Sequence, residues 1–306
     1  LHFNHDVIDH LMDNYSLRPA PRMGMGSDVK RTQYGVRLIA DLAFSPRSTG
    51  AVGLDLHRQA HYFSEAHRGR ARGDFNNDMD IQNFGVFLEY NQTLKERARL
   101  RSGLRFDRQT TAYHNALFHN AMGRRTRDLI PGSASEHAVS GFVRYERDAV
   151  QKPLTFYVGV GHAERPADYW EAFKTWEANS NRSRGQTAAP SEARPAREKN
   201  TQIDLGWVYA GEKENASLSL YCAHISDFIL RQPTGAYGNV NARLYGLEAE
   251  YTRTVSPHWT LGASLAYTRG DDRTNRAALP QIAPLEANLT AKYQHGKGEA
   301  NLICRL

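Results

Sequence analysis

The chain has 306 residues, a formal net charge of +6 and a mean hydropathy of −0.63. It contains no run of about 18 apolar residues, which excludes a transmembrane helix. Two cysteines, Cys222 and Cys304, are too few for a disulfide scaffold and lack metal-ligand spacing. The basic residues are spread along the chain rather than grouped in one patch, so we expect no nucleic-acid partner.

Alternation of apolar and polar residues predicts strands along the whole chain. Several of these runs reach about ten residues, which is the length that a tilted strand needs to cross a bilayer. In chain order, we expect strands at about 1–12, 31–44, 50–63, 80–93, 99–107, 137–147, 154–162, 201–209, 216–230, 240–254, 259–267, 285–293 and from 299 onward.

The clearest alternation runs from Val240 to Tyr293, and it separates two sets of side chains. The set expected to face lipid is Leu247, Ala249, Tyr251, Leu261, Ala263, Leu265, Leu285, Leu289 and Ala291. The set expected to face the lumen is Glu248, Glu250, Glu286, Asn288 and Lys292. Aromatic residues close the runs, as they do at the interfaces of membrane barrels. They are Tyr251, Trp259, Tyr267 and Tyr293.

The connections between the predicted strands alternate between short turns and longer polar loops. Bacterial outer-membrane barrels have this asymmetry, with short periplasmic turns and long extracellular loops. A soluble sandwich or solenoid is the alternative, but its loops need not alternate in length. The short turns are expected at 45–49, 95–96, 149–152, 211–215, 255–257 and 295–298, and the long loops at 13–28, 64–78, 111–135, 164–197, 231–239 and 269–284.

The predicted fold is therefore all-β, an antiparallel transmembrane β-barrel. About thirteen strands is an odd number, whereas bacterial single-chain barrels have even numbers. The chain also begins and ends inside alternating patterns. We therefore expect residues 1–306 to be one partial barrel domain, a fragment of something larger.

No sequence motif for catalysis is present: Gly-x-Ser-x-Gly, a Walker-type loop, a dinucleotide fingerprint, His-Glu-x-x-His and Cys-x-x-Cys are all missing. We expect no enzyme activity. His10-Leu11-Met12 does suggest a binding site, because residues two apart on a strand share a face. An imidazole and a thioether together suit copper, especially Cu(I).

With Phe3, Val7 and Leu11 toward lipid, His10 and Met12 are expected on the lumen side of the first strand. Met23-Gly24-Met25 in the next loop would add soft ligands near the same end. The alternative is that Met12 fills a strand end and that the loop methionines make exposed apolar contacts.

Several stretches resemble the barrel of TonB-dependent outer-membrane receptors, and in particular their copper receptor branch. The two stretches that point to copper are His10-Leu11-Met12-Asp13-Asn14-Tyr15-Ser16-Leu17-Arg18 and Gly161-His162-Ala163-Glu164-Arg165-Pro166-Ala167-Asp168-Tyr169-Trp170-Glu171. The stretches that point to the wider group are Glu198-Lys199-Asn200-Thr201 leading into Gly206-Trp207, Asp227-Phe228-Ile229-Leu230, Tyr245-Gly246-Leu247-Glu248 and Leu279-Pro280-Gln281-Ile282.

This resemblance implies a plug domain inside a barrel of 22 strands, of which the chain would supply about 13 and no plug. It implies a place in the bacterial outer membrane, in contact with lipid and lipopolysaccharide, and energy from the TonB complex delivered through the plug. It also implies a copper site that joins a Cys-x-x-x-Met element of the plug to a His-x-Met element of the barrel, here His10 and Met12. Copper would be the transported ion, and no organic cofactor is implied.

Two other functions stay open beside copper uptake. One is a ferric-siderophore receptor of the same fold, in which the loop aromatics Tyr169, Trp170 and Trp176 contact the metal chelate. The other is a structural or adhesive barrel without transport. A Cys-x-x-x-Met element in a plug would favour copper over a siderophore.

Overall fold

The computed structural model describes residues 1–17, 24–67, 75–114, 117–119, 125–128, 132–173, 175 and 194–306. Most of these residues lie in strands, and a short helical segment occupies 169–173. The strands are β1 (His2–Asp13), β2 (Met25–Ser45), β3 (Ser48–His67), β4 (Asn76–Lys95), β5 (Ala98–Tyr113), β6 (Leu117–His119), β7 (Arg125–Asp128), β8 (Gly132–Asp148), β9 (Leu154–Arg165), β10 (Glu198–Ala210), β11 (Glu214–Arg231), β12 (Tyr237–Thr254), β13 (Trp259–Asp272), β14 (Ala277–Ala278), β15 (Glu286–His295) and β16 (Gly298–Arg305).

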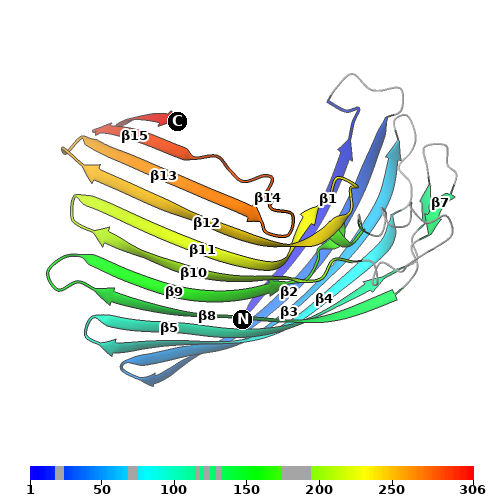
Figure 1. Cartoon of the computed structure of the whole chain (residues 1–306), viewed down its shortest axis with the longest axis horizontal. Helices are drawn as coiled ribbons and strands as arrows, with labels where there is room; N and C mark the ends of the chain where they lie inside the picture. The colour runs from blue at the N-terminus through cyan, green and yellow to red at the C-terminus, as the bar shows by residue number, and fades with distance from the viewer. Residues whose placement is uncertain are drawn as a thin grey trace.

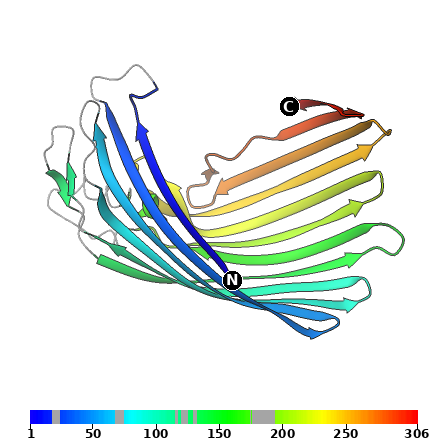
Figure 2. The ribbon, with the colours of Figure 1, turned by 180° about the vertical axis from the view of Figure 1, so that it is seen from behind.

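The main sheet is antiparallel and follows the chain from β1 to β16, each strand pairing with the next one in the order of the sheet. Strand β14 pairs with β13 beside this path, and β6 and β7 form a separate two-stranded ribbon. Within the described residues β1 and β16 do not pair with each other, so the sheet is open. Figures 1 and 2 show it curved like a trough. No helix in the described ranges is long and apolar enough to cross a membrane.

The short turns all lie at one end of the sheet and the long loops at the other, as predicted, because every strand is antiparallel to its neighbours. We call these the turn end and the loop end; in Figure 1 the short turns lie along the left side. Most strands are longer than predicted at the loop end. For example, β2 begins at Met25 instead of about 31, and β5 continues to Tyr113.

Two predicted loops also contain strands. The interval 111–135 holds β6 and β7, and 269–284 holds β14. Alternation could not reveal elements of two to four residues, because so short a run has no period to read.

The register between strands sorts the side chains onto two faces. Residues directly opposite each other share a face, and Leu265 lies opposite Ala249 and Ala287. We call this the apolar face, and it carries the predicted lipid-facing residues of β12, β13 and β15. Leu261 and Leu289 are 43% and 52% exposed there, since no second layer from the described residues covers them.

The opposite face, here the polar face, carries networks of charged side chains. Arg37 Nε lies 2.6 Å from Asp55 Oδ1, and Arg105 bridges Asp55 and Asp107. A second network joins Arg99 to Asp148 at 2.6 Å and to Glu146 at 3.2 Å. Charges in a single-layer sheet are stabilised in this way, because each carboxylate accepts hydrogen bonds from a guanidinium on the same face.

Candidate functional site

The two predicted metal ligands, His10 and Met12, lie near the loop end of β1. Within the same strand His2 pairs with Arg37, which places the even-numbered residues of β1 on the polar face. His10 pairs with Val29 and Met12 with Ser27, whereas Leu11 between them points to the apolar face. Both side chains are exposed, Met12 to 41%. The geometry therefore leaves an imidazole and a thioether side by side and accessible.

Around His10 and Met12, the described part of the chain adds no cluster of the usual metal-binding side chains. No group of three His, Cys, Asp or Glu side chains within it could hold a metal ion. Met23 lies outside the described residues, and so does the side chain of Met25. The structure thus leaves the pair at His10 and Met12 without a described third ligand.

A buried cluster lies on the polar face beside this pair, where the chain after β9 returns over the sheet. Its members come from four strands and from the helical segment at 169–173. They are Val29, Phe63, Met79, Tyr113, Tyr169 and Phe173, with Ile81 and Trp170 packed against them. Val29, the partner of His10 in the register, belongs to the cluster, so the predicted ligands border it directly.

His61 is a buried polar side chain of this region. Its ring is 3% exposed, and it stacks on the ring of Tyr169 with the centroids 3.6 Å apart. His61 Nδ1 lies 2.7 Å from Asp78 Oδ1, and the Tyr169 hydroxyl donates to Asp78 Oδ2. Because an ionised carboxylate can only accept, Nδ1 carries the hydrogen. One carboxylate thus holds both a strand histidine and the returning loop.

A capping box starts the helical segment. The Glu171 backbone N–H donates to Asp168 Oδ1 at 2.8 Å, and the Asp168 N–H donates to Glu171 Oε2 at 2.8 Å. This reciprocal pair satisfies two backbone donors that have no partner within the helix. The sequence Asp168-Tyr169-Trp170-Glu171 therefore dictates a helix start that turns Tyr169 toward the sheet.

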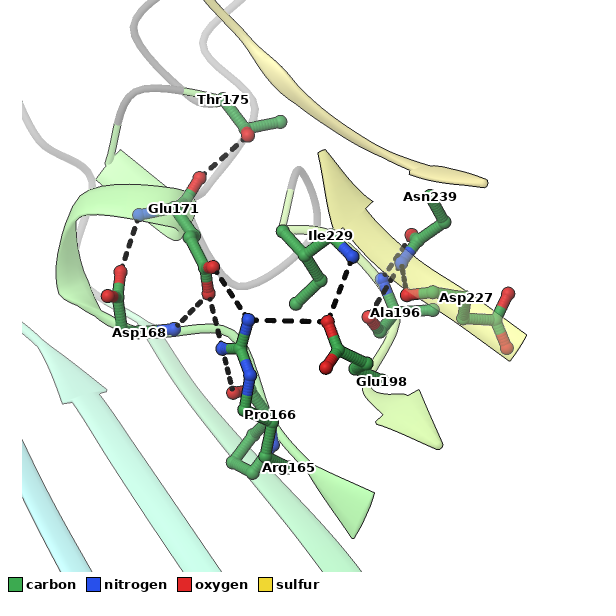
Figure 3. A network of polar contacts seen from close by, with 10 residues as sticks. All are labelled: Arg165, Pro166, Asp168, Glu171, Thr175, Ala196, Glu198, Asp227, Ile229 and Asn239. Atoms are coloured by element: carbon green, nitrogen blue, oxygen red, sulfur yellow. Dashed lines mark hydrogen bonds and ion pairs between the residues drawn. The ribbon is translucent and has the colours of Figure 1, made fainter. Parts of the chain in front are cut away.

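A network of polar contacts ties the same segment to β9 and β10 (Figure 3). Arg165 Nη1 and Nη2 donate to the two carboxylate oxygens of Glu171 at 2.8 and 2.9 Å. Arg165 Nη2 also lies 3.4 Å from Glu198, whose other contact is the Ile229 backbone N–H. Ion pairs of Arg165 therefore hold the segment after β9 to strands β9 and β10.

Asn239 of β12 holds the other end of the long connection. It accepts the Ala196 N–H at 2.8 Å, and its amide donates to the carbonyls of Ala196 and Asp227 at 2.9 and 2.6 Å (Figure 3). Nearer the helical segment, Thr175 Oγ1 donates to the Glu171 carbonyl and accepts the Tyr237 N–H at 3.0 Å. Both ends of the connection are thus fixed to strands.

The sequence alone did not single out His61, Asp78 or Met79. Asp78 and Tyr169 are 91 residues apart, so no local pattern connects them. The sequence carried only a weak signal for this cluster. His61 and Phe63 share a face of one strand, and Met79 and Ile81 share a face of the next. Of the aromatics proposed for a siderophore, Tyr169 is buried at 7% exposure, and Trp176 lies outside the described residues.

Comparison with known proteins gives the same fold. Residues 1–301 match the family model "TonB dependent receptor-like, beta-barrel". Among curated protein sequences none matches. The chain is similar to a solved structure titled copper transporter OprC, at 31% identity and a TM-score of 0.85, over 99% of this chain and 48% of that one.

Two iron-related receptors are similar in fold alone. The ferric yersiniabactin uptake receptor FyuA from Yersinia pestis matches at 15% identity and a TM-score of 0.69, over 94% of this chain and 43% of that one. The ferric citrate transporter FecA matches at 14% identity and a TM-score of 0.72, over 98% and 44%. The chain spans about half the length of these structures.

Proteins of this family are receptors of the bacterial outer membrane and not enzymes. The family model covers almost the whole chain, and the predicted antiparallel transmembrane barrel sheet is confirmed. The chain therefore belongs to the TonB-dependent receptor-like β-barrel family.

Proposed function

We propose that the chain is part of the barrel of an outer-membrane receptor that takes up copper ions. In this proposal the apolar face contacts lipid and lipopolysaccharide, the polar face lines the lumen, and residues 1–306 form one partial barrel domain. The rest of the receptor supplies a plug and, through it, contact with the TonB complex. His10 and Met12 are the ligands that the barrel contributes.

The observation that carries the proposal is the 31% identity, over 99% of this chain, to a protein titled as a copper transporter. The chemistry of the paired ligands supports it. His10 and Met12 share the polar face at the loop end, where an ion arriving from outside would first meet the barrel. An imidazole with a thioether favours Cu(I) over harder ions.

A ferric-siderophore receptor is the second candidate, because receptors of that kind share the fold. Their identity to the chain is 14–15%, which supports the fold and not the cargo. Tyr169, one of the aromatics considered for chelate contact, is already engaged in stacking on His61 and in donating to Asp78. That engagement favours copper over a siderophore for this site.

Uptake by cells tests the proposal. The complete receptor is expressed in cells that lack their own copper receptor, and accumulation of radioactive copper is compared with accumulation of ferric siderophores. We expect TonB-dependent copper accumulation in the wild type and its loss in His10→Ala and Met12→Ala. His5→Ala is the matched control, because His5 lies on the same strand but on the apolar face, opposite Tyr34.

Accumulation of a ferric siderophore without copper would favour the second candidate. Accumulation of neither would favour a barrel without transport. Equal copper accumulation in wild type, His10→Ala and Met12→Ala would remove these two residues from the site.

A further inference from the structure

We propose that His61 and Met79 form a second soft-metal site, which binds a monovalent ion such as Cu(I) or Ag(I) beneath the helical segment at 169–173. The proposal rests on the geometry of these two side chains and does not require copper to be the transported cargo. It concerns neither His10 nor Met12.

The first support is the hydrogen bonding of His61. Its Nδ1–H is committed to Asp78, so the lone pair of the neutral ring lies on Nε2. Nε2 is buried and has no hydrogen-bond partner among the described residues. A buried polar atom without a partner is destabilising, and each such atom calls for a reason. A metal ion on Nε2 supplies one.

The second support is the carboxylate behind the ring. Histidines that bind metals commonly donate their other ring N–H to a carboxylate, which fixes the tautomer and makes the free nitrogen a better ligand. Asp78 does this for His61 at 2.7 Å, and Asp78 is itself fully buried. The Tyr169 hydroxyl donates to its second oxygen and so holds the carboxylate in place.

The third support is the thioether. Met79 lies directly opposite His61 in the register of β3 and β4, on the same face, and it is 1% exposed. Residues opposite each other across antiparallel strands have Cβ atoms about 4.5–5.5 Å apart, so imidazole and thioether can converge on one ion. Nitrogen and thioether sulfur are the ligands that Cu(I) prefers.

Charge decides between a monovalent and a divalent ion. A charge in a buried site must be balanced by a partner. Asp78 is the carboxylate that contacts His61, and Met79 has no ionisable group. A single positive charge on Nε2 and the sulfur would be neutralised by Asp78, whereas a divalent ion would leave one charge in excess.

The test uses the complete receptor in detergent, carrying His10→Ala and Met12→Ala so that the first site is absent. Ag(I) replaces Cu(I), because it has similar ligand preferences and does not oxidise in air. Bound silver is counted by mass spectrometry after gel filtration. Folding is checked for every variant by the slower migration of heated barrel protein in gels.

We expect one fewer silver ion per chain when Met79→Leu is added to this background, since leucine keeps the volume and removes the sulfur. We expect the same loss with His61→Gln. His114→Gln is the matched control: His114 Nε2 also contacts a carboxylate, Asp80, at 3.0 Å, but its side chain is 40% exposed. This control should keep its silver.

X-ray absorption at the silver edge gives the second readout. In the background protein, the silver that Met79→Leu loses should have one nitrogen and one sulfur neighbour, seen as the difference between the two spectra after each is scaled by its silver content. Equal silver content in the background, Met79→Leu and His61→Gln proteins would overturn the proposal and leave His61 as a structural residue. That outcome would not touch copper uptake through His10 and Met12, because both are absent from every protein in this comparison.

Discussion

The turn end and the loop end of this sheet are built differently. At the turn end, neighbouring strands meet through local hairpins, and large apolar side chains such as Trp259 stay 44% exposed. At the loop end, contacts join distant parts of the chain, and Phe63, Met79 and Tyr169 are buried together. Apart from alanines, the buried apolar side chains of the described residues all lie in or over the loop-end half of the sheet.

This difference follows from the layer structure of the molecule. A sheet must bury its apolar face against another layer, and here the described residues offer a second layer only where a loop returns over the polar face. In a membrane barrel, lipid takes that role on the apolar face. The protein interior is therefore confined to the end where function is proposed, and its stability depends on the loop.

The largest effect is expected from opening that interior. Phe63→Ala should lower the free energy of unfolding by about 3–5 kcal/mol, because a cavity forms beneath Phe173 and Tyr169. The measurement is urea unfolding of the complete receptor from phospholipid vesicles. Phe84→Ala is the control of equal size on the apolar face, where Phe84 is 44% exposed and lipid can refill the space. Equal losses in the two variants would erase the distinction between the buried cluster and the exposed apolar face.

The next effect tests the apolar face between the two ends. Ala263 lies opposite Tyr251 and Leu289, so Ala263→Arg should cost about 2–4 kcal/mol if this position is near the middle of the bilayer. Ser264→Arg, one residue along on the polar face, should cost much less. The same vesicle unfolding assay compares them. A larger loss for Ser264→Arg would reverse the assignment of the faces.

A smaller effect is expected at the helix start. Asp168→Ala should cost about 0.5–2 kcal/mol, because the Glu171 N–H loses its acceptor. Hydrogen exchange of the amides in 168–175 should be faster, while the amides of the turn-end hairpins are unchanged. Asp168→Asn keeps an N-cap acceptor and serves as the control. Unchanged protection in Asp168→Ala would mean that packing on the sheet alone holds the segment.

The sequence predicted the turn end better than the loop end. Alternation over about eight or more residues located the thirteen strands of the sheet path, and the pairing of Leu265 with Ala249 confirms that these two predicted lipid-facing residues share a face. The Asp168–Glu171 capping box is a local pattern, but it was not among the sequence predictions. The cluster around His61 was not predicted either, since its partners Asp78 and Tyr169 meet only after the chain has folded. The strands were also predicted too short at the loop end, because their last residues pair only once the chain has folded.

The position of the predicted ligands is intermediate between these cases. The period of two was sufficient to put His10 and Met12 on one face, and the register agrees. Their role as metal ligands depends on partners that the described residues do not include, and it stays a prediction. Its support comes from the chemistry of the pair and from the similarity to a copper transporter.

The most direct test of the central claim is the copper content of the purified complete receptor. Wild type, His10→Ala, Met12→Ala and the control His5→Ala are loaded with Cu(I) under reducing conditions, freed of excess metal and analysed for copper, with zinc loading measured in parallel. We expect copper in the wild type and in His5→Ala, its loss in His10→Ala and Met12→Ala, and unchanged zinc in all four. Equal copper in all four proteins would contradict the account.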